Sequence, residues 1–263
     1  MRRKQPLGQN FLKDENIARE IVALAGIEPE GTVVEIGPGP GILTHGLLEA
    51  CASLLAVEID PQLCRQLRKR YNNNPKFKLV EADAMNYDYS QAGPRFQAVS
   101  NLPYYAAMPI LKRLIHYRQN IVNMTLMLQK EVVNRLVAKP GCKEYGSLTV
   151  FTQFHCQVER LLEVGKRSFD PPPKVNSAVI HLTPHPEPPV EVNDAKTFFR
   201  VVHAAFFHKR KMLRNNLKEL DKHFHVDFGK IEQAGIDPSR RGETLSLQEF
   251  AALSNLMEAR THE

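Results

Sequence analysis

The chain has 263 residues, 43% of them hydrophobic and 24% charged, so it is long enough for one large domain or for a large domain with a smaller one. Its formal net charge of +6 at pH 7 favours a polyanionic partner over an acidic small molecule alone. No stretch reaches the ~18 apolar residues that span a bilayer, and the first residues lack the apolar core of a signal peptide. We therefore expect a cytoplasmic protein with no membrane partner.

The cysteines and histidines argue against a disulfide framework and against a metal site. The four cysteines are Cys51, Cys64, Cys142 and Cys156. No pair of them has C-x-x-C spacing, so we expect free, mostly buried thiols in a reducing compartment. The ten histidines are scattered, and Pro184 interrupts any helix that would align His181 with His185. We expect no bound metal.

Helical patterns alternate with short apolar runs along the first half of the chain. Asp14 is positioned to cap the first helix, which Gly26 ends, and Pro61 stands in the first turn of another. The predicted helices are residues 15–26, 41–50, 61–71, 109–117 and 129–138. The predicted strands are residues 32–37, 53–60, 76–83, 96–101 and 122–128. Alternation of this kind predicts an α/β fold with a mostly parallel sheet that helices cover on both faces.

The pattern changes after about residue 139. Two further strand candidates, residues 160–164 and 177–182, are close in sequence, which predicts an antiparallel edge to the sheet. A stiff, proline-rich segment at residues 168–177 connects them.

A second proline-rich stretch, residues 183–192, is typical of a linker. The chain beyond it is largely helical, and Ser246 with Glu249 predicts a capping box for the last helix. We therefore expect two domains: residues 1–186, which contain the sheet, and residues 190–263, a small α-helical domain.

A glycine-rich turn lies between the first long strand and its helix. In "VVEIGPGPGILT" the glycines are Gly37, Gly39 and Gly41, which allow a tight turn and a close approach of the backbone to a ligand. Ile42 occupies the last glycine position of the dinucleotide fingerprint, so that fingerprint is absent. The phosphate-binding motif of nucleotide triphosphatases is absent too. Alone, the turn is equally typical of an ordinary strand-to-helix connection.

Acidic residues close the next two strands. Glu58 lies 21 residues after Gly37, where it is positioned to accept hydrogen bonds from both hydroxyls of a ribose. Asp83, followed by Ala84, is positioned at the next strand end to accept a bond from an adenine amino group. A glycine loop and two acids at successive strand ends favour a nucleoside pocket. Without a phosphate loop, S-adenosylmethionine is the favoured ligand, and a hydride carrier is the weaker alternative.

The motif "NLPYY" follows the predicted strand at residues 96–101. The Asn101 side-chain oxygen and the Leu102 carbonyl are placed to accept the two N–H groups of an adenine amine, which aims the nitrogen lone pair at a methyl group. Pro103 fixes the backbone, and Tyr104 offers a ring for stacking on the purine. Phe169 is a candidate for the opposite face of the base, although a core phenylalanine is the simpler interpretation.

The ordered set of motifs "QNFL", "VVEIGPGPGILT", "VEID", "EADAM", "NLPYY" and "FDPPPKVNSAV" resembles rRNA adenine N6-dimethyltransferases. The tail, with "FFHKRKMLRNNLKEL" and "AGIDPSRRGETLSLQEFAAL", is similar to the small-subunit branch, often called dimethyladenosine transferase. The resemblance runs from about Gln9 to the last helix.

The resemblance implies a Rossmann-like methyltransferase domain that uses S-adenosyl-L-methionine. It implies two methyl transfers to each of two adjacent adenines in a hairpin loop near the 3′ end of small-subunit rRNA, and a role in late subunit assembly. By position, Asn10 and Leu12 would contact the methionine end of the cofactor, above Gly37 and Gly39. Glu58, Asp83 and Ala84 would hold its adenosine, Asn101 would lie between cofactor and target, and Tyr104 and Phe169 would sandwich the target base. Many relatives have Asn where this chain has Tyr105.

Basic residues are concentrated in residues 196–222, where eight Lys and Arg residues and two acidic residues give a net charge of +6. Such clustering favours contact with RNA phosphates over a merely solvated surface. The candidate RNA-binding residues are Lys209, Arg210, Lys211, Arg214, Arg240 and Arg241. We expect the partner to be small-subunit rRNA within an immature subunit, bound by a monomer.

Three other functions stay open at this point. One is the related large-subunit methyltransferase that confers antibiotic resistance, against which the tail motif argues. Another is an assembly factor in which binding matters more than catalysis. The third and most distant is a nicotinamide-dependent dehydrogenase.

Overall fold

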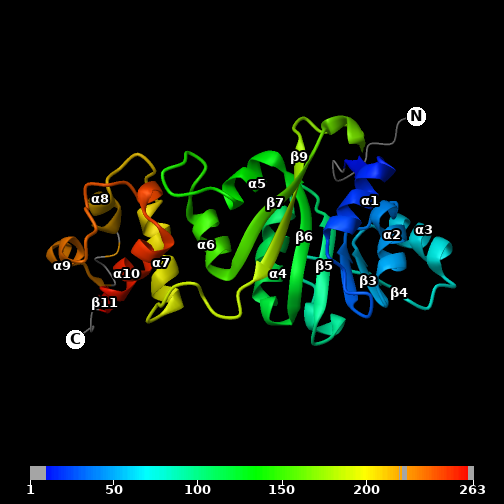
Figure 1. Ribbon diagram of the computed structural model, residues 1–263, viewed down its shortest axis with the longest axis horizontal. Helices are drawn as coiled ribbons and strands as arrows, with labels where there is room; N and C mark the ends of the chain where they lie inside the picture. The colour runs from blue at the N-terminus through cyan, green and yellow to red at the C-terminus, as the bar shows by residue number, and fades with distance from the viewer. Residues whose placement is uncertain (1–9, 219, 221–223, 260–263) are drawn as a thin grey trace. The chain divides into compact units, whose positions relative to one another are not determined.

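The computed structural model describes residues 10–218, 220 and 224–259 (Figure 1). The chain divides into two compact units. The first contains residues 1–133 and 157–184, and the second contains residues 134–156 and 185–263.

The first unit is built on a seven-stranded sheet. Its strands, in spatial order, are β4 (Phe77–Glu81), β3 (Ser53–Glu58), β2 (Thr32–Ile36), β5 (Phe96–Asn101), β6 (Ile121–Gln129), β9 (Ser177–Pro184) and β7 (Cys156–Val164). The pairs from β4 to β6 are parallel, and β9 runs antiparallel to β6. The predicted α/β class, with a mostly parallel sheet and an antiparallel edge, is confirmed.

One helix precedes the parallel strands, and three others connect them. They are α1 (Glu15–Leu24), α2 (Ile42–Ala50), α3 (Pro61–Tyr71) and α4 (Ala107–His116). Asp14 caps α1 by accepting hydrogen bonds from the N–H groups of Asn16 and Ile17, as predicted. Pro61 is the first residue of α3, where its missing N–H costs no hydrogen bond.

The central strands are buried on both faces, as parallel strands between helices must be. Val33 and Val34 are both fully buried although they point to opposite faces of β2. One core joins α1, α2 and α3 to the sheet through Ile21, Leu47 and Leu67 among others. This packing holds the carboxyl ends of the strands at one rim.

The strand order places the topological switch point beside β2. The chain passes from β2 to β3 on one side and returns to β5 on the other. Ligands bind at such a point, outside the carboxyl ends of the strands.

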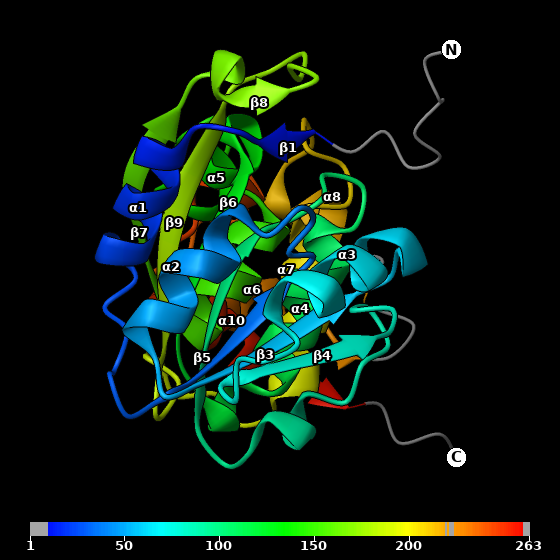
Figure 2. The same cartoon turned by 90° about the vertical axis from the view of Figure 1, so that its right-hand side faces the viewer.

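Short elements lie around the sheet. The two-residue strand β1 (Phe11–Leu12) pairs antiparallel with β8 (Phe169–Asp170), so the first described residues lie beside the segment that precedes β9 (Figure 2). Short 3-10 turns occur at η1 (Tyr89–Ala92), η2 (Arg118–Asn120) and η3 (Lys166–Ser168).

The second unit is mainly helical and has its own core. Its helices are α6 (Ser147–His155), α7 (Ala195–Ala205), α8 (Leu213–Leu217), α9 (Phe228–Gln233) and α10 (Leu247–Asn255). The helix α5 (Lys130–Leu136) crosses from the first unit into the second. The turn η5 (Gly242–Thr244) and a pair of short strands, β10 (Phe224–His225) and β11 (Glu258–Ala259), complete the unit. The capping box of Ser246 and Glu249 at the start of α10 is confirmed.

The observed division differs from the expected one, in which a single boundary lay between residues 186 and 190. Residues 134–156 belong to the second unit, because α6 packs there. The Phe154 ring of α6 stacks on the Phe198 ring of α7 with centroids 4.7 Å apart. The sequence did not indicate this helix, since Thr, Val and Phe are weak helix formers and no polar cap precedes it.

Among the described residues, no helix has both the length and the apolar character to cross a membrane. Cys51 and Cys64 are buried free thiols and Cys142 is an exposed one, as expected, and Cys156 is buried.

Candidate active site

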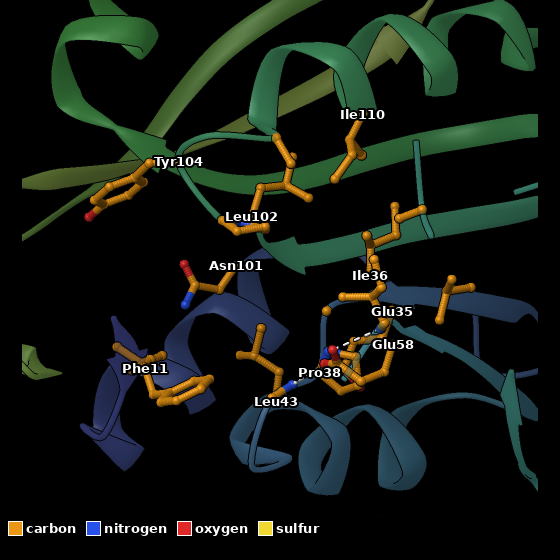
Figure 3. Close-up of a pocket in the computed structure, with 18 of the residues that line it drawn as sticks. Phe11, Glu35, Ile36, Pro38, Leu43, Glu58, Asn101, Leu102, Tyr104 and Ile110 are labelled. Carbon is orange, nitrogen blue, oxygen red and sulfur yellow. Dashed lines mark hydrogen bonds between the residues drawn. The ribbon is translucent and has the colours of Figure 1, made fainter. Parts of the chain in front are cut away.

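A cavity opens at the carboxyl ends of β2, β3 and β5, in the first unit (Figure 3). Its walls come from β1, the glycine loop, the ends of β3 and β5, and the segment that follows β4. Eleven of the predicted cofactor and catalytic residues line it: Asn10, Leu12, Gly37, Gly39, Glu58, Asp83, Ala84, Asn101, Leu102, Pro103 and Tyr104. Residues far apart in the sequence are therefore brought together at the switch point.

The glycine loop needs its glycines for backbone conformation and for space. Gly37 and Gly39 have φ angles of +61° and +59°, which residues other than glycine rarely adopt. A Cβ on Gly39 would lie 3.0 Å from two ring carbons of Phe11. A Cβ on Gly37 would meet only Pro103, at 3.9 Å, although Gly37 lines the cavity. The loop therefore leaves room for a ligand to approach its backbone.

Glu58 is held in the cavity wall by three backbone N–H groups. Its Oε1 accepts bonds from Ile59 and Asp60, at 2.9 Å each, and its Oε2 accepts one from Gly39 at 3.2 Å. The carboxyl group is almost completely buried, and this burial raises its pKa above the ordinary value, while the three N–H groups oppose the shift. A carboxylate has about four acceptor positions, so one remains for a ligand hydroxyl.

Asp83 and Ala84 occupy the turn after β4. The Asp83 carboxylate accepts bonds from the Met85 N–H at 2.9 Å and from the Asn86 amide at 2.8 Å. The Tyr89 hydroxyl donates to the Ala84 carbonyl at 2.9 Å. These bonds fix the turn against the cavity, although they also engage both carboxylate oxygens of Asp83.

Asn101 ends β5 with its side chain directed into the cavity (Figure 3). Within the described part of the chain, neither its side-chain amide nor the Leu102 carbonyl takes part in a hydrogen bond to another residue. The Leu102 N–H donates to Met127 on β6 at 3.2 Å, which anchors the motif to the sheet. Two fixed acceptors are therefore available to a ligand amine.

Tyr104 is oriented by β9. Its hydroxyl oxygen lies 2.8 Å from Oγ of Ser177, a fully buried residue at the start of that strand. The contact joins "NLPYY" to "KVNSAV", two motifs more than seventy residues apart. Ser177 was not among the predicted site residues, since a lone serine in a strand carries no signal of its own.

The structure does not place Phe169 in the cavity. Its ring is 1% exposed and belongs to the core shared by α1, α2 and the sheet. Its strand, β8, pairs with β1, so that Phe169 lies opposite Leu12. The aromatic side chain that does line the cavity from β1 is Phe11, and in Figure 3 Asn101 lies between Phe11 and Tyr104. A stacking role for Phe169 stays a prediction that requires the ring to leave this core.

Glu35 is a site residue that the sequence interpretation missed. It lines the cavity at the end of β2, is 1% exposed and accepts a hydrogen bond from the Thr44 hydroxyl at 2.7 Å. Burial raises its pKa from 4.5 to about 8, the Thr44 bond opposes the shift and the nearby Glu58 adds to it. The sequence does contain a signal for this residue, since Glu35 is an acidic residue within an apolar strand pattern.

The predicted RNA-binding cations of the second unit differ in the hydrogen bonds and ion pairs that they form with other residues of the chain. Arg240 donates to both carboxylate oxygens of Glu249 and to the Thr244 carbonyl and hydroxyl. It therefore clamps the start of α10, and this network leaves little of its guanidinium for RNA. Lys209 donates to the Lys143 carbonyl at 2.6 Å.

The other four predicted RNA-binding residues are exposed. Arg214 lies 3.8 Å from Glu232, and Arg241 lies 4.0 Å from Glu243. Within the described residues, Arg210 and Lys211 have no ion pair and no side-chain hydrogen bond.

A Rossmann-like sheet with a glycine loop, a buried glutamate and an Asn-Leu-Pro-Tyr motif at one rim is typical of an S-adenosylmethionine-dependent methyltransferase. The model of the family described as ribosomal RNA adenine dimethylase matches residues 1–259. This chain therefore belongs to that family, whose methyl donor is S-adenosylmethionine.

Curated relatives and solved structures support the same family assignment. "Ribosomal RNA small subunit methyltransferase A" of Hydrogenovibrio crunogenus is 44% identical over 259 residues, 96% of each chain. The protein of the same name from Clostridium botulinum is 44% identical and covers 95% of this chain and 92% of its own. A dimethyladenosine transferase from Plasmodium falciparum is similar in structure, with a TM-score of 0.78, 26% identity, and coverage of 92% of this chain and 95% of that one. The 23S rRNA methyltransferase ErmE has a TM-score of 0.73 and 25% identity, and covers 93% of this chain and 98% of its own.

The residues present fit S-adenosylmethionine. Gly37 leaves open space where a Cβ atom would stand, and Glu58 retains an acceptor for a ribose hydroxyl. Apolar walls from Phe11, Ile36 and Leu43 line the same cavity and suit the uncharged faces of an adenosine.

Proposed function

We propose that this chain methylates N6 of two adjacent adenines in the 3′-terminal hairpin loop of small-subunit rRNA, twice each, within an immature small subunit. The names of the 44%-identical relatives support the small subunit as the substrate. The chain is proposed to act as a monomer. A further role in late subunit assembly is part of the same proposal.

The observation that carries the chemistry is the pair of acceptors at Asn101 and Leu102. Neither is engaged within the described residues, and both belong to a segment anchored on β6. When the target amine donates its two N–H groups to them, the nitrogen becomes more tetrahedral and its lone pair points away from the acceptors. Because the acceptors are fixed before the reaction, little reorganisation is needed.

S-adenosylmethionine supplies an electrophilic methyl carbon on a positively charged sulfur. With that group bound, Asn101 and Leu102 would hold the amine so that its nitrogen could accept the methyl group, with the C–S bonding electrons left on sulfur and one amine proton released to water. No general base is required, since the methylated ammonium is far more acidic than the starting amine. Tyr104, held by Ser177, stacks on the purine and keeps the nitrogen in line.

Glu58, Asp83 and Ala84 hold the adenosine part of the cofactor, and Asn10, Leu12, Gly37 and Gly39 surround its methionine part. This assignment is supported by the cavity that these residues share. Arg210 and Lys211 contact RNA phosphates from the second unit. Arg240 is not included, because its guanidinium stabilises α10.

Radiolabelled methyl transfer to unmethylated small subunits, followed by mapping of the modified bases, tests the proposal. The wild-type chain should modify two adjacent adenines, and Asn101→Ala should lower kcat at least 100-fold with S-adenosylhomocysteine affinity reduced much less. Full activity in Asn101→Ala would refute the mechanism. Large subunits are offered in competition, since the resemblance to ErmE makes them the alternative substrate, and preferential labelling of large-subunit rRNA would refute the substrate assignment.

A further inference from the structure

A second hollow lies entirely within the second unit, on the exposed side of α7. It is lined by Lys196, Phe199, Arg200, His203, Ala204, Phe207 and Leu220. The floor is apolar, because Ala204 and Leu220 are each 5% exposed and Phe199 is partly buried against the core. None of the cavity residues assigned above belongs to it.

The lining residues follow one face of the helix. Positions 196, 200 and 203 are spaced by four and three residues, so their side chains are neighbours. Phe207 extends the same face into the turn after α7, where its N–H donates to the Ala204 carbonyl at 3.0 Å. Cations and flat rings therefore share one short groove.

Phe207 is unusual for its exposure. Its ring is 57% exposed, and its edge-on neighbour is the His208 ring, with centroids 4.7 Å apart. The His203 ring lies 6.3 Å away. Exposed phenylalanine surface is unfavourable in water, so this ring has apolar area available for contact with another flat group.

The charged side chains that line the groove are all basic. Within the described residues, Lys196 and Arg200 have no ion pair and no side-chain hydrogen bond, unlike Lys209, Arg214 and Arg240. Cations that form no ion pair among the described residues, beside an exposed ring, suit a partner that presents phosphates and flat bases together. They suit an acidic protein surface less well, since such a surface supplies no group for the ring.

We propose that this groove binds an unpaired nucleotide of the RNA, with the base stacked on Phe207 and the flanking phosphates held by Lys196 and Arg200. The inference rests on the proposed function and adds a second, non-catalytic base contact to it. Its role is to position the substrate, so that it affects RNA affinity and leaves cofactor binding unchanged.

The first experiment uses fluorescence. The chain contains no tryptophan, so Phe207→Trp introduces a single reporter into the full-length protein. A short single-stranded RNA of mixed sequence should quench it, and the same sequence as a duplex should quench it much less. Equal quenching by both, or none by either, would overturn the stacking contact.

The second experiment measures affinity for unmethylated small subunits over a range of salt concentrations. Phe207→Ala and Phe207→Leu should each weaken binding roughly 5- to 100-fold with an unchanged salt slope, while Phe207→Tyr keeps wild-type affinity. Wild-type binding by Phe207→Leu would instead indicate simple apolar docking, as with a protein partner. Because the ring is exposed, none of these changes should impair folding.

Lys196→Ala with Arg200→Ala should lower the slope of log affinity against log salt by roughly 1.4, the value for two phosphate contacts to a single strand. The charge-preserving pair Lys196→Arg with Arg200→Lys is the matched control and should retain the slope. An unchanged slope in the alanine pair would refute the phosphate contacts. Cofactor affinity and methyl transfer at saturating subunit concentration should be unaffected, whereas failure of the proposed function itself would appear in the wild-type assay.

Discussion

At the scale of single residues, Glu35 is a buried carboxyl whose pKa lies well above its ordinary value. The raised pKa of about 8 follows from its burial in the wall of the active-site cavity. Below pH 4.5 the group is protonated in the folded and the unfolded chain alike. As the pH rises toward 8 only the unfolded chain releases the proton, so the free energy of unfolding falls over this range.

Glu35→Gln removes this titration and keeps an acceptor for the Thr44 hydroxyl. We expect the variant to lose the fall in stability between pH 4.5 and 8, an effect on the order of a few kcal/mol. Urea unfolding at several pH values measures it. Glu49→Gln, a change at an exposed carboxyl of α2, serves as control and should keep the wild-type pH dependence. Parallel curves for wild type and Glu35→Gln would contradict the assignment.

At the scale of elements, the turn between β2 and α2 depends on the close approach of β1. Gly39→Ala would place a methyl group 3.0 Å from the Phe11 ring and force φ = +59° on alanine. We expect destabilisation by about 1 kcal/mol or more, with S-adenosylhomocysteine affinity reduced at least 10-fold, because the loop must move into the cavity. Calorimetric titration measures the affinity.

Gly26→Ala is a matched control for the backbone strain. Gly26 has nearly the same φ, +57°, but a Cβ there would meet nothing within 4 Å. It should lose stability and keep cofactor affinity. Equal affinities for Gly39→Ala and wild type would show that the loop does not contact the cofactor.

At the scale of the whole molecule, the two units have separate cores, and the second includes a helix from the middle of the chain. Phe154→Ala removes a fully buried ring from the second core, where it stacks on Phe198. We expect this core to lose about 3–5 kcal/mol, while cofactor binding in the first unit persists. Urea unfolding and calorimetric titration with S-adenosylhomocysteine measure the two effects.

Phe151→Ala, on the same helix, is the control with a partly exposed ring, and it should cost less. If Phe154→Ala abolished cofactor binding under conditions in which the wild type is folded, the two units would have to unfold together.

Much of the fold follows from local sequence. The alternation of strands and helices, the cap at Asp14, Pro61 and the capping box at Ser246 all act within a few residues, so the sequence displays them directly. The strand-end positions of Gly37, Glu58 and Asn101 were predictable for the same reason, since parallel strands bring their carboxyl ends to one rim.

Long-range packing decided the rest. Helix α6 depends on the packing of Phe154 against Phe198, because its own residues have weak helical propensity. Pairing of β1 with β8 buries Phe169 and presents Phe11 to the cavity, which no local pattern specifies. Whether a cation forms an ion pair, as Arg240 does and as Arg200 does not among the described residues, depends on partners that only folding brings near. The sequence by itself determined the class of fold and the chemistry at the rim, because both follow from local periodicity and motif order. The tertiary structure alone decided which side chains face ligand, core or solvent, because those environments arise only from contacts between distant segments.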